Sequence, residues 1–169
     1  MKKLFVLTIL VCGITIYGYS QEVNILRVEK INTQNLTRGD IVTIGIYIDT
    51  YAEKIGALQL YLEYDRKVLD FAQDVNIHPE MASEWMSNDS EHFYASNWLT
   101  TEPKGVKFVE GDKLFDLEFK YLGGETDITW QTEQIVEDGK VVNGSTLMYN
   151  SSGELLPLTL MPGCVCATE

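Results

Sequence analysis

Hydrophobic and polar residues alternate with a period of two along residues 41–64 of the chain. One parity is apolar in both halves of this stretch, and it comprises Val42, Ile44, Ile46 and Ile48, then Leu58, Leu60, Leu62 and Tyr64. Alternation of this length is typical of β-strands that bury one face and expose the other. The break at residues 51–54 is short and polar, so we expect neighbouring strands at 41–50 and 55–64.

The same period returns in several short segments along the rest of the chain. We predict further strands at 23–30, 67–71, 114–121, 126–130 and 145–149, and hairpins around residues 88–90 and 138–139. No segment has a helical period. Many short strands separated by turns indicate an all-β sandwich. Residues 150–169 either add an edge strand to it or form a tail.

Four segments form a wider pattern, which extends over roughly residues 23–149. They are G-D-I-V at 39–42, L-E-Y-D at 62–65, G-D-K-L-F-D-L-E-F-K at 111–120 and T-D-I-T-W at 126–130. In order and spacing, these segments resemble the cohesin family of bacterial extracellular modules. The resemblance implies a nine-stranded β-sandwich with jelly-roll topology over residues 21–149. Arg66 departs from the family, which usually has proline after Y-D.

The resemblance also implies a binding surface. In the family, the strand at 55–64 neighbours the strand at 92–99 in the sheet that binds dockerins, which are small calcium-dependent partner modules. The outward parity of residues 55–64 carries Ala57, Gln59, Tyr61 and Glu63. The family's polar recognition pair, asparagine and aspartate, falls here on Ala57 and Gln59. This departure permits a partner other than the usual dockerin.

The parity of residues 92–99 is open in the sequence. If Phe93 and Ala95 face the core, then Tyr94 and Trp98 face outward, where aromatic rings can anchor a protein or stack on a sugar. With the opposite parity, Trp98 belongs to the core. We include Tyr94 and Trp98 with the four residues above in the candidate partner-binding site. Trp130 alternates with Ile128 and is predicted to be buried.

The N-terminal residues predict a signal peptide over residues 1–20. Lys2 and Lys3 precede an apolar run at 4–16, and Gly18-Tyr19-Ser20 supplies small residues before the expected cleavage after Ser20. The run is too short for a comfortable membrane span, and no second one follows. Cys12 follows Val11, where a lipoprotein site needs a small residue. We therefore expect a secreted, periplasmic or surface protein without a membrane span.

The charge of the chain limits its partners. Removing Lys2 and Lys3 leaves 11 of the 13 basic residues against 25 acidic ones, a net charge of −14. Such a charge repels nucleic acid and anionic lipid. A neutral glycan or a basic protein surface remains compatible with it.

Enzymatic and metal-binding motifs are absent from the sequence. Acids such as Asp116 and Glu118 alternate with core residues, as on a solvated strand face, so we expect no catalytic carboxylate pair. His78 and His92 have no clustered partners, and we expect no metal and no cofactor. Near the end of the chain, Cys164 and Cys166 form either a disulfide or two free thiols.

Together these features predict a secreted, non-catalytic, cohesin-like binding module. Its expected work is attachment to a dockerin-like protein in a bacterial extracellular assembly, with a link to polysaccharide degradation. Two alternatives stay open. The first is a carbohydrate-binding module that recognises a polysaccharide through exposed aromatics, because cohesins share their jelly roll with such modules. The second is an adhesin or a pilus-type structural subunit.

Overall fold

The structure is a computed structural model, and it describes residues 23–50, 54–90, 93–137 and 140–167. The predicted signal peptide, His92 and the turn at 138–139 lie outside the described residues.

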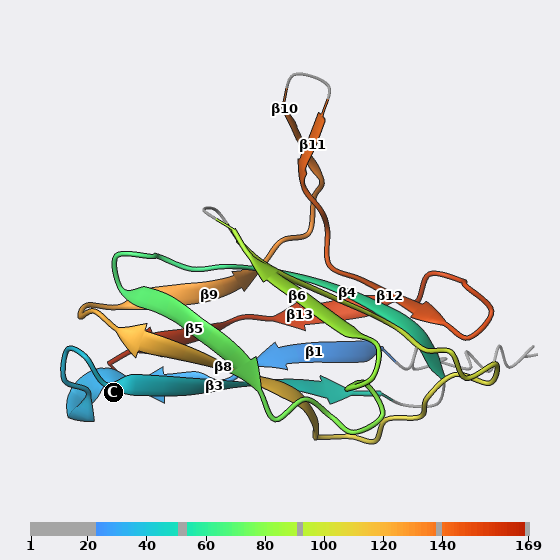
Figure 1. Ribbon diagram of the computed structural model, residues 1–169, viewed down its shortest axis with the longest axis horizontal. Helices are drawn as coiled ribbons and strands as arrows, with labels where there is room; N and C mark the ends of the chain where they lie inside the picture. Colours follow the sequence, from blue (N-terminus) through green and yellow to red (C-terminus); the bar gives the residue numbers. More distant parts are fainter. Residues whose placement is uncertain (1–22, 51–53, 91–92, 138–139, 168–169) are drawn as a thin grey trace, which may run out of the picture.

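Two β-sheets pack face to face (Figure 1). The first has the strand order β13-β1-β3-β8-β5, formed by β13 (Leu158–Met161), β1 (Asn24–Val28), β3 (Ile41–Asp49), β8 (Asp112–Tyr121) and β5 (Leu69–Val75). The second has the order β2-β14-β9-β4-β7-β6, formed by β2 (Lys30–Asn32), β14 (Gly163–Cys166), β9 (Thr126–Trp130), β4 (Ile55–Glu63), β7 (Tyr94–Leu99) and β6 (Trp85–Asp89).

Four elements complete the described chain. Strand β12 (Leu147–Asn150) pairs with β4 beside β9, and β10 (Ile135–Glu137) and β11 (Lys140–Asn143) form a hairpin outside the two sheets. A single short 3₁₀ helix, η1 (Thr33–Asn35), begins after Asn32, whose side chain accepts a hydrogen bond from the Gln34 amide. The all-β class predicted from the sequence is confirmed.

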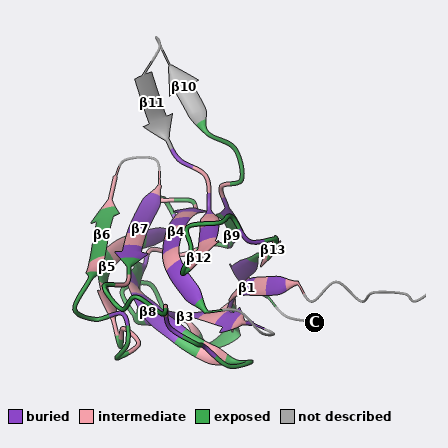
Figure 2. Ribbon diagram, turned by 90° about the vertical axis from the view of Figure 1, so that its right-hand side faces the viewer, coloured by how far each residue is buried: buried purple, intermediate pink, exposed green. Residues whose placement is uncertain are grey.

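The core lies between the two sheets, and alternate residues of the central strands fill it (Figure 2). The apolar parity of β3 is at most 3% exposed, and Leu58, Leu60 and Leu62 of β4 are at most 2% exposed. The predicted parity of both strands is therefore confirmed. The prediction that they are neighbours is wrong, because the chain crosses after β3 from the first sheet to the second, where β4 pairs with β7, β9 and β12. On β8, Phe115, Leu117 and Phe119 are fully buried.

The sandwich continues past Tyr149. Strand β13 pairs in parallel with β1 at the edge of the first sheet, and β14 lies between β2 and β9 in the second. The predicted burial of Trp130 is confirmed, and its indole N–H donates to the Met161 carbonyl at 3.0 Å. Cys164 and Cys166 form a disulfide within β14.

One prediction about β8 is wrong. Asp116 is only 3% exposed, although the alternation of the sequence places it on the solvated face. Its carboxylate is covered because Lys113 forms an ion pair with it at 2.9 Å and the Asn76 side-chain amide donates to it at 2.8 Å. The hydrogen bond between Lys113 and Asp116 raises the pKa of Lys113. Buried charges are found paired in this way, so Asp116 has a structural role.

Candidate functional site

The solvent side of the second sheet presents a broad surface, which we call the outer face. It is formed by the outward residues of β6, β7, β4 and β12. These are Met86, Asn88, Ala95, Asn97, Leu99, Ala57, Gln59, Tyr61, Glu63, Leu147 and Tyr149. Four of the six predicted site residues, those of β4, lie on this face.

The other two predicted site residues do not. Tyr94 is fully buried and Trp98 is 1% exposed. The register explains this, because Tyr94 pairs with Leu62 and Trp98 pairs with Leu58. Residues that are directly opposite in an antiparallel pair point to the same side of the sheet. The outward assignment of Tyr94 and Trp98 is therefore wrong, and both belong to the core.

The core contacts of these two residues agree with this correction. The Trp98 ring packs edge-on against Phe108 with centroids 5.9 Å apart, and the Tyr94 ring lies 5.3 Å from Phe71. Burial raises the pKa of the Tyr94 phenol. Polar Ser96 shares their inward side and is fully buried, whereas Ala95 faces outward, opposite Tyr61. This inversion of polarity is what misled the sequence-based parity.

The reversed parity brings residues to the outer face that the sequence analysis missed. Leu99 on β7 and Met86 on β6 are each 66% exposed, although both are large and apolar. A signal was present in the sequence. In the observed hairpin, whose turn comes later than the predicted one at 88–90, Trp85 lies opposite Trp98, and a register with both tryptophans facing inward places Leu99 outward.

In the middle of the face, contacts with neighbouring residues fix the β4 side chains. The Gln59 side-chain amide donates to the Ser145 carbonyl at 3.0 Å. The Tyr61 ring lies 5.4 Å from the Phe93 ring and directly against Gly144, where an added Cβ would approach the ring to 2.5 Å. Both side chains are thus held in place on the face before any partner arrives.

At one end of the sheet, on its inward side, a polar cluster joins the turn after β4 to the end of β6, since Asp89 lies opposite the buried Tyr94. The Asp89 carboxylate at the end of β6 accepts two hydrogen bonds from the Arg66 guanidinium, at 2.5 and 2.7 Å, and one from the Tyr64 hydroxyl at 2.7 Å. Burial, and then the hydrogen bond to Asp89, raise the pKa of Tyr64. A bidentate pair of this kind fixes geometry as well as charge. Arg66 therefore ties the turn after β4 to β6.

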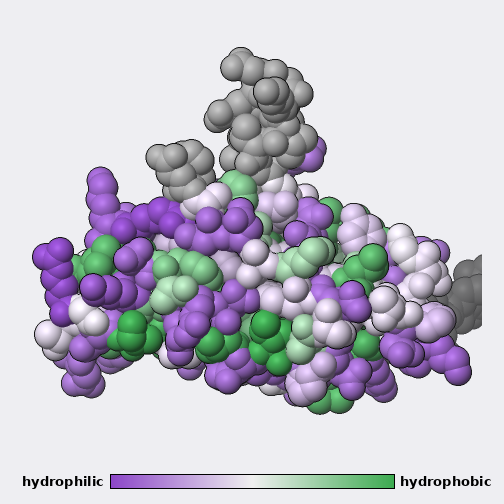
Figure 3. Space-filling view, in the orientation of Figure 1, coloured by the Kyte–Doolittle hydropathy of each residue, from purple (hydrophilic) through white to green (hydrophobic). Residues whose placement is uncertain are grey.

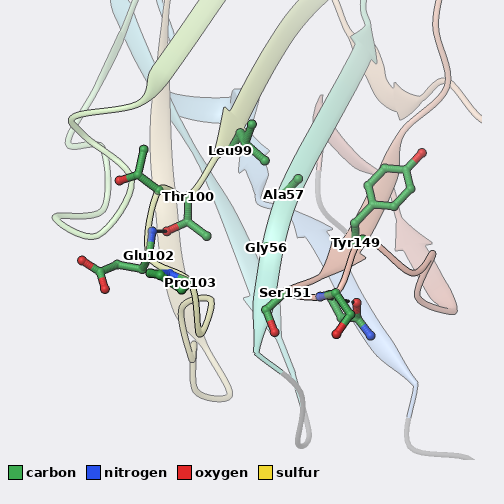
Figure 4. A pocket seen from close by; sticks show the side chains of 12 residues that line it. Gly56, Ala57, Leu99, Thr100, Glu102, Pro103, Tyr149 and Ser151 are labelled. Carbon is green, nitrogen blue, oxygen red and sulfur yellow. Dashed lines mark hydrogen bonds between the residues drawn. The ribbon is translucent and has the colours of Figure 1, made fainter.

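The other end of the face is hollowed. Gly56 and Ala57 of β4 form the floor of a hollow of 470 Å³, with Leu99 and residues 100–103 on one side and Tyr149 and residues 150–153 on the other (Figure 4). A second hollow of 220 Å³ adjoins it and is lined by Met86, Asn97 and Trp98 among others. The two share Ala57, Leu99 and Tyr149, so they adjoin each other across these residues, and we call the two hollows together the depression.

Close packing of backbones explains why the floor is so low. A Cβ on Gly56 would lie 2.4 Å from the Asn150 carbonyl oxygen and 2.9 Å from the Ser151 Cα. The Gly56 carbonyl also accepts a hydrogen bond from the Thr100 amide at 2.9 Å. Glycine at position 56 thus lets the end of β12 approach β4 on one side of the hollow, and the backbone hydrogen bond from Thr100 holds the loop after β7 on the other.

We expect Gly56→Ala to lower the free energy of unfolding by about 1–3 kcal/mol, the usual cost of overpacking. The clash is with backbone, which cannot rotate away. The neighbouring substitution Ala57→Val, at a half-buried position that faces outward, should change the stability by less than about 0.5 kcal/mol. Urea unfolding of both variants measures this. Equal stability of Gly56→Ala and the parent would show that the close approach of β12 is wrong.

Elsewhere the surface is mixed. In the view of Figure 3, apolar side chains form small separate groups among polar ones. Among the described residues, no group of three or more His, Cys, Asp or Glu side chains could hold a metal ion. None of the described residues forms a helix with the length and apolar composition of a membrane span.

The chain matches one known family in sequence and several solved structures in fold. The family model for the cohesin domain matches residues 29–154. No curated protein matches it in sequence.

Among solved structures, several cohesins share the fold. The OlpA cohesin, in a type I cohesin–dockerin complex from Clostridium thermocellum, is 11% identical with a TM-score of 0.66, over 85% of this chain and 98% of that one. The sixth cohesin of scaffoldin B from Acetivibrio cellulolyticus, in complex with a dockerin, is 11% identical with a TM-score of 0.67, over 86% and 99%. A non-cellulosomal cohesin from the archaeon Archaeoglobus fulgidus is 13% identical with a TM-score of 0.61, over 86% and 92%.

Proposed function

The chain belongs to the cohesin family of non-catalytic protein-binding modules, and we propose that it binds a dockerin-like protein through the outer face. The observation that carries the proposal is the position of the outer face in the fold. It is the exposed side of the sheet that contains β4 and β7, and it presents Leu99 and Met86 at 66% exposure. Large apolar side chains gathered on a flat exposed surface are typical of protein-binding sites.

The β4 residues Ala57, Gln59, Tyr61 and Glu63 form the proposed contact line. Tyr61 is the expected anchor, because Phe93 and Gly144 hold its ring before binding and little side-chain entropy is then lost. Ala57 and Gln59 replace the polar pair that cohesins use at these positions. We infer that the partner is a divergent dockerin whose contact surface is less polar there.

We place this attachment outside the cell, in an assembly that acts on polysaccharide. The support is the predicted signal peptide at 1–20 and the dockerin complexes of the similar structures, two of which come from Clostridium thermocellum and Acetivibrio cellulolyticus. The carbohydrate-binding alternative is weaker, because Tyr94 and Trp98 are core residues and only Tyr61 of its three predicted aromatics faces outward. Nothing on the described surface favours the adhesin or pilus alternative.

The test is a calorimetric titration with calcium-loaded dockerin modules from the same organism. We expect at least one to bind with a Kd of about 1 µM or tighter, and EDTA to abolish the binding. If no dockerin binds while a glycan array gives a specific signal, the carbohydrate-binding function replaces the one proposed.

The contact line is tested by Tyr61→Ala against the same dockerin. We expect the affinity to fall by about tenfold or more, since the substitution removes the anchoring ring. Tyr47→Ala is the matched control, because Tyr47 is a half-buried tyrosine on β3 in the opposite sheet, with Arg27 4.5 Å over its ring. Thermal melts verify that both variants fold. Equal losses in both would place the contact away from the outer face.

A further inference from the structure

The depression at the end of the outer face has a floor and walls that could hold a single side chain of a partner. Its floor is made of the two smallest side chains of β4, Gly56 and Ala57, and its walls are Leu99 and Tyr149 on the strands to either side (Figure 4). The walls come from β7 and β12, which are separated by the width of β4. A ligand group that enters between them contacts three strands at once.

The walls and floor are apolar at their centre. Leu99 is 66% exposed and faces the depression from β7, while Met86, also 66% exposed, lines its continuation towards β6. An apolar group that covers these two side chains removes their surface from water, which is favourable by about 25 cal/mol per Å². Apart from the Tyr149 phenol, the hydroxyl groups of the larger hollow lie on its rim, at residues 100–101 and 151–152, and Gln59 and Asn97 bring side-chain amides to the smaller one.

The charge around the depression selects what accompanies the apolar group. Among the described residues that line either hollow, Glu102 is the one charged residue. Its side chain is exposed on the outer side of the rim (Figure 4), and none of the described cations forms an ion pair with it. The whole chain has a net charge of −12. A basic residue on the partner would therefore be attracted to this rim.

We propose that the depression anchors one large apolar side chain, leucine, isoleucine, methionine or phenylalanine, from a protein segment that carries a basic residue beside it. This inference rests on the proposed function and names the chemistry of its partner. The apolar anchor replaces the contacts that the family's polar pair makes, since Ala57 and Gln59 stand at the positions of that pair. Specificity then comes from filling the space over Gly56 and Ala57 and from the carboxylate of Glu102.

The probe for the test is a phage-displayed library of random twelve-residue peptides, panned on the full chain. We expect enriched peptides to share one large apolar residue with Lys or Arg next to it. Their binding should fall at least tenfold on Ala57→Leu, which fills the floor of the depression, and on Leu99→Ala, which removes a wall. The matched controls are Thr43→Leu and Ile41→Ala, at exposed positions of β3 in the opposite sheet, and both should bind like the parent.

The charge arm uses Glu102→Gln, which should weaken the enriched peptides about threefold and reduce the dependence of their binding on salt. Glu110→Gln, at an exposed position outside the depression, should change neither.

Three results would overturn the inference: enrichment of acidic or purely polar peptides, recovery of the same peptides on Ala57→Leu, and displacement of the peptides by soluble cello-oligosaccharides. Dockerin binding that survives Ala57→Leu would also overturn it, while leaving the proposed function in place. If peptides of the expected kind are enriched but no dockerin binds, the proposed function is overturned and the chemistry inferred for the depression stands.

Discussion

Replacing Trp98 with alanine is expected to lower the free energy of unfolding by about 3–5 kcal/mol, the usual cost of removing a buried tryptophan. Trp98 is 1% exposed, lies opposite Leu58 on β4 and Trp85 on β6, and packs edge-on against Phe108. Its removal would leave a large cavity between the sheets. Urea unfolding, followed by circular dichroism because the substitution removes a fluorophore, measures the loss.

Two further variants make the Trp98 experiment specific to the register of β7. Asn97→Ala, on the outward side of the same strand, should cost less than about 0.5 kcal/mol. Trp98→Phe should cost less than Trp98→Ala, because it keeps a ring and removes an indole N–H that makes no hydrogen bond among the described residues. If Trp98→Ala instead folds like the parent and loses affinity for a partner, the outward parity is right and the structure of β7 is wrong.

Phe119→Ala is expected to cost about 3–5 kcal/mol as well. Phe119 is fully buried on β8 and joins the aromatic contacts between the sheets, with ring centroids 4.9 Å from Tyr64 and 5.8 Å from Phe71. The loss of the ring would leave Tyr64 without its packing partner, although Tyr64 is also held by its hydrogen bond to Asp89. Chemical unfolding of the purified variant measures the effect.

Gln59→Ala provides the comparison for Phe119. Gln59 lies on the outer face and makes one hydrogen bond, to the Ser145 carbonyl. Losing it should cost about 1 kcal/mol, since water can replace the amide at a half-exposed carbonyl. A larger loss for Gln59→Ala than for Phe119→Ala would contradict the assigned inward side of β8 and outward side of β4.

The architecture could be predicted from the sequence where polarity and burial coincide. On β3 and β4, every inward side chain of the alternating set is aliphatic, so the period of two determines the side that faces the core. Turn residues then separate the strands. The alternation, the turns and the order of the four cohesin-like segments at 39–42, 62–65, 111–120 and 126–130 were together enough to predict the sandwich.

The prediction failed where a strand violates that rule. On β7, Ser96 is buried and Leu99 is 66% exposed, so the polarity of single residues points to the wrong side. Asp116 on β8 is buried for another reason. Lys113 and Asn76 cover its carboxylate, and the alternation of polar and apolar residues does not predict either contact. Contacts with residues distant in sequence contribute to both cases, the pairing of β7 with β4 to the first and Asn76 to the second, and the pattern of one strand does not contain them.

One part of the candidate site could be predicted from the sequence and another part could not. Ala57, Gln59, Tyr61 and Glu63 could be placed on one face from the alternation of β4 alone. The depression could not, because it depends on the approach of the Asn150 backbone to Gly56 and on the loop that follows Leu99. Contacts between segments that lie far apart in sequence shape the part of the face with the most distinctive chemistry.

The central claim is that this cohesin binds its partner through the outer face. The most direct test is to map backbone amide chemical shifts of the labelled chain during titration with the dockerin found by calorimetry. The account predicts that the largest changes occur at Ala57, Gln59, Tyr61 and Leu99. Changes concentrated instead at Thr43, Gln73 and Glu118, on the solvent side of the opposite sheet, would contradict it.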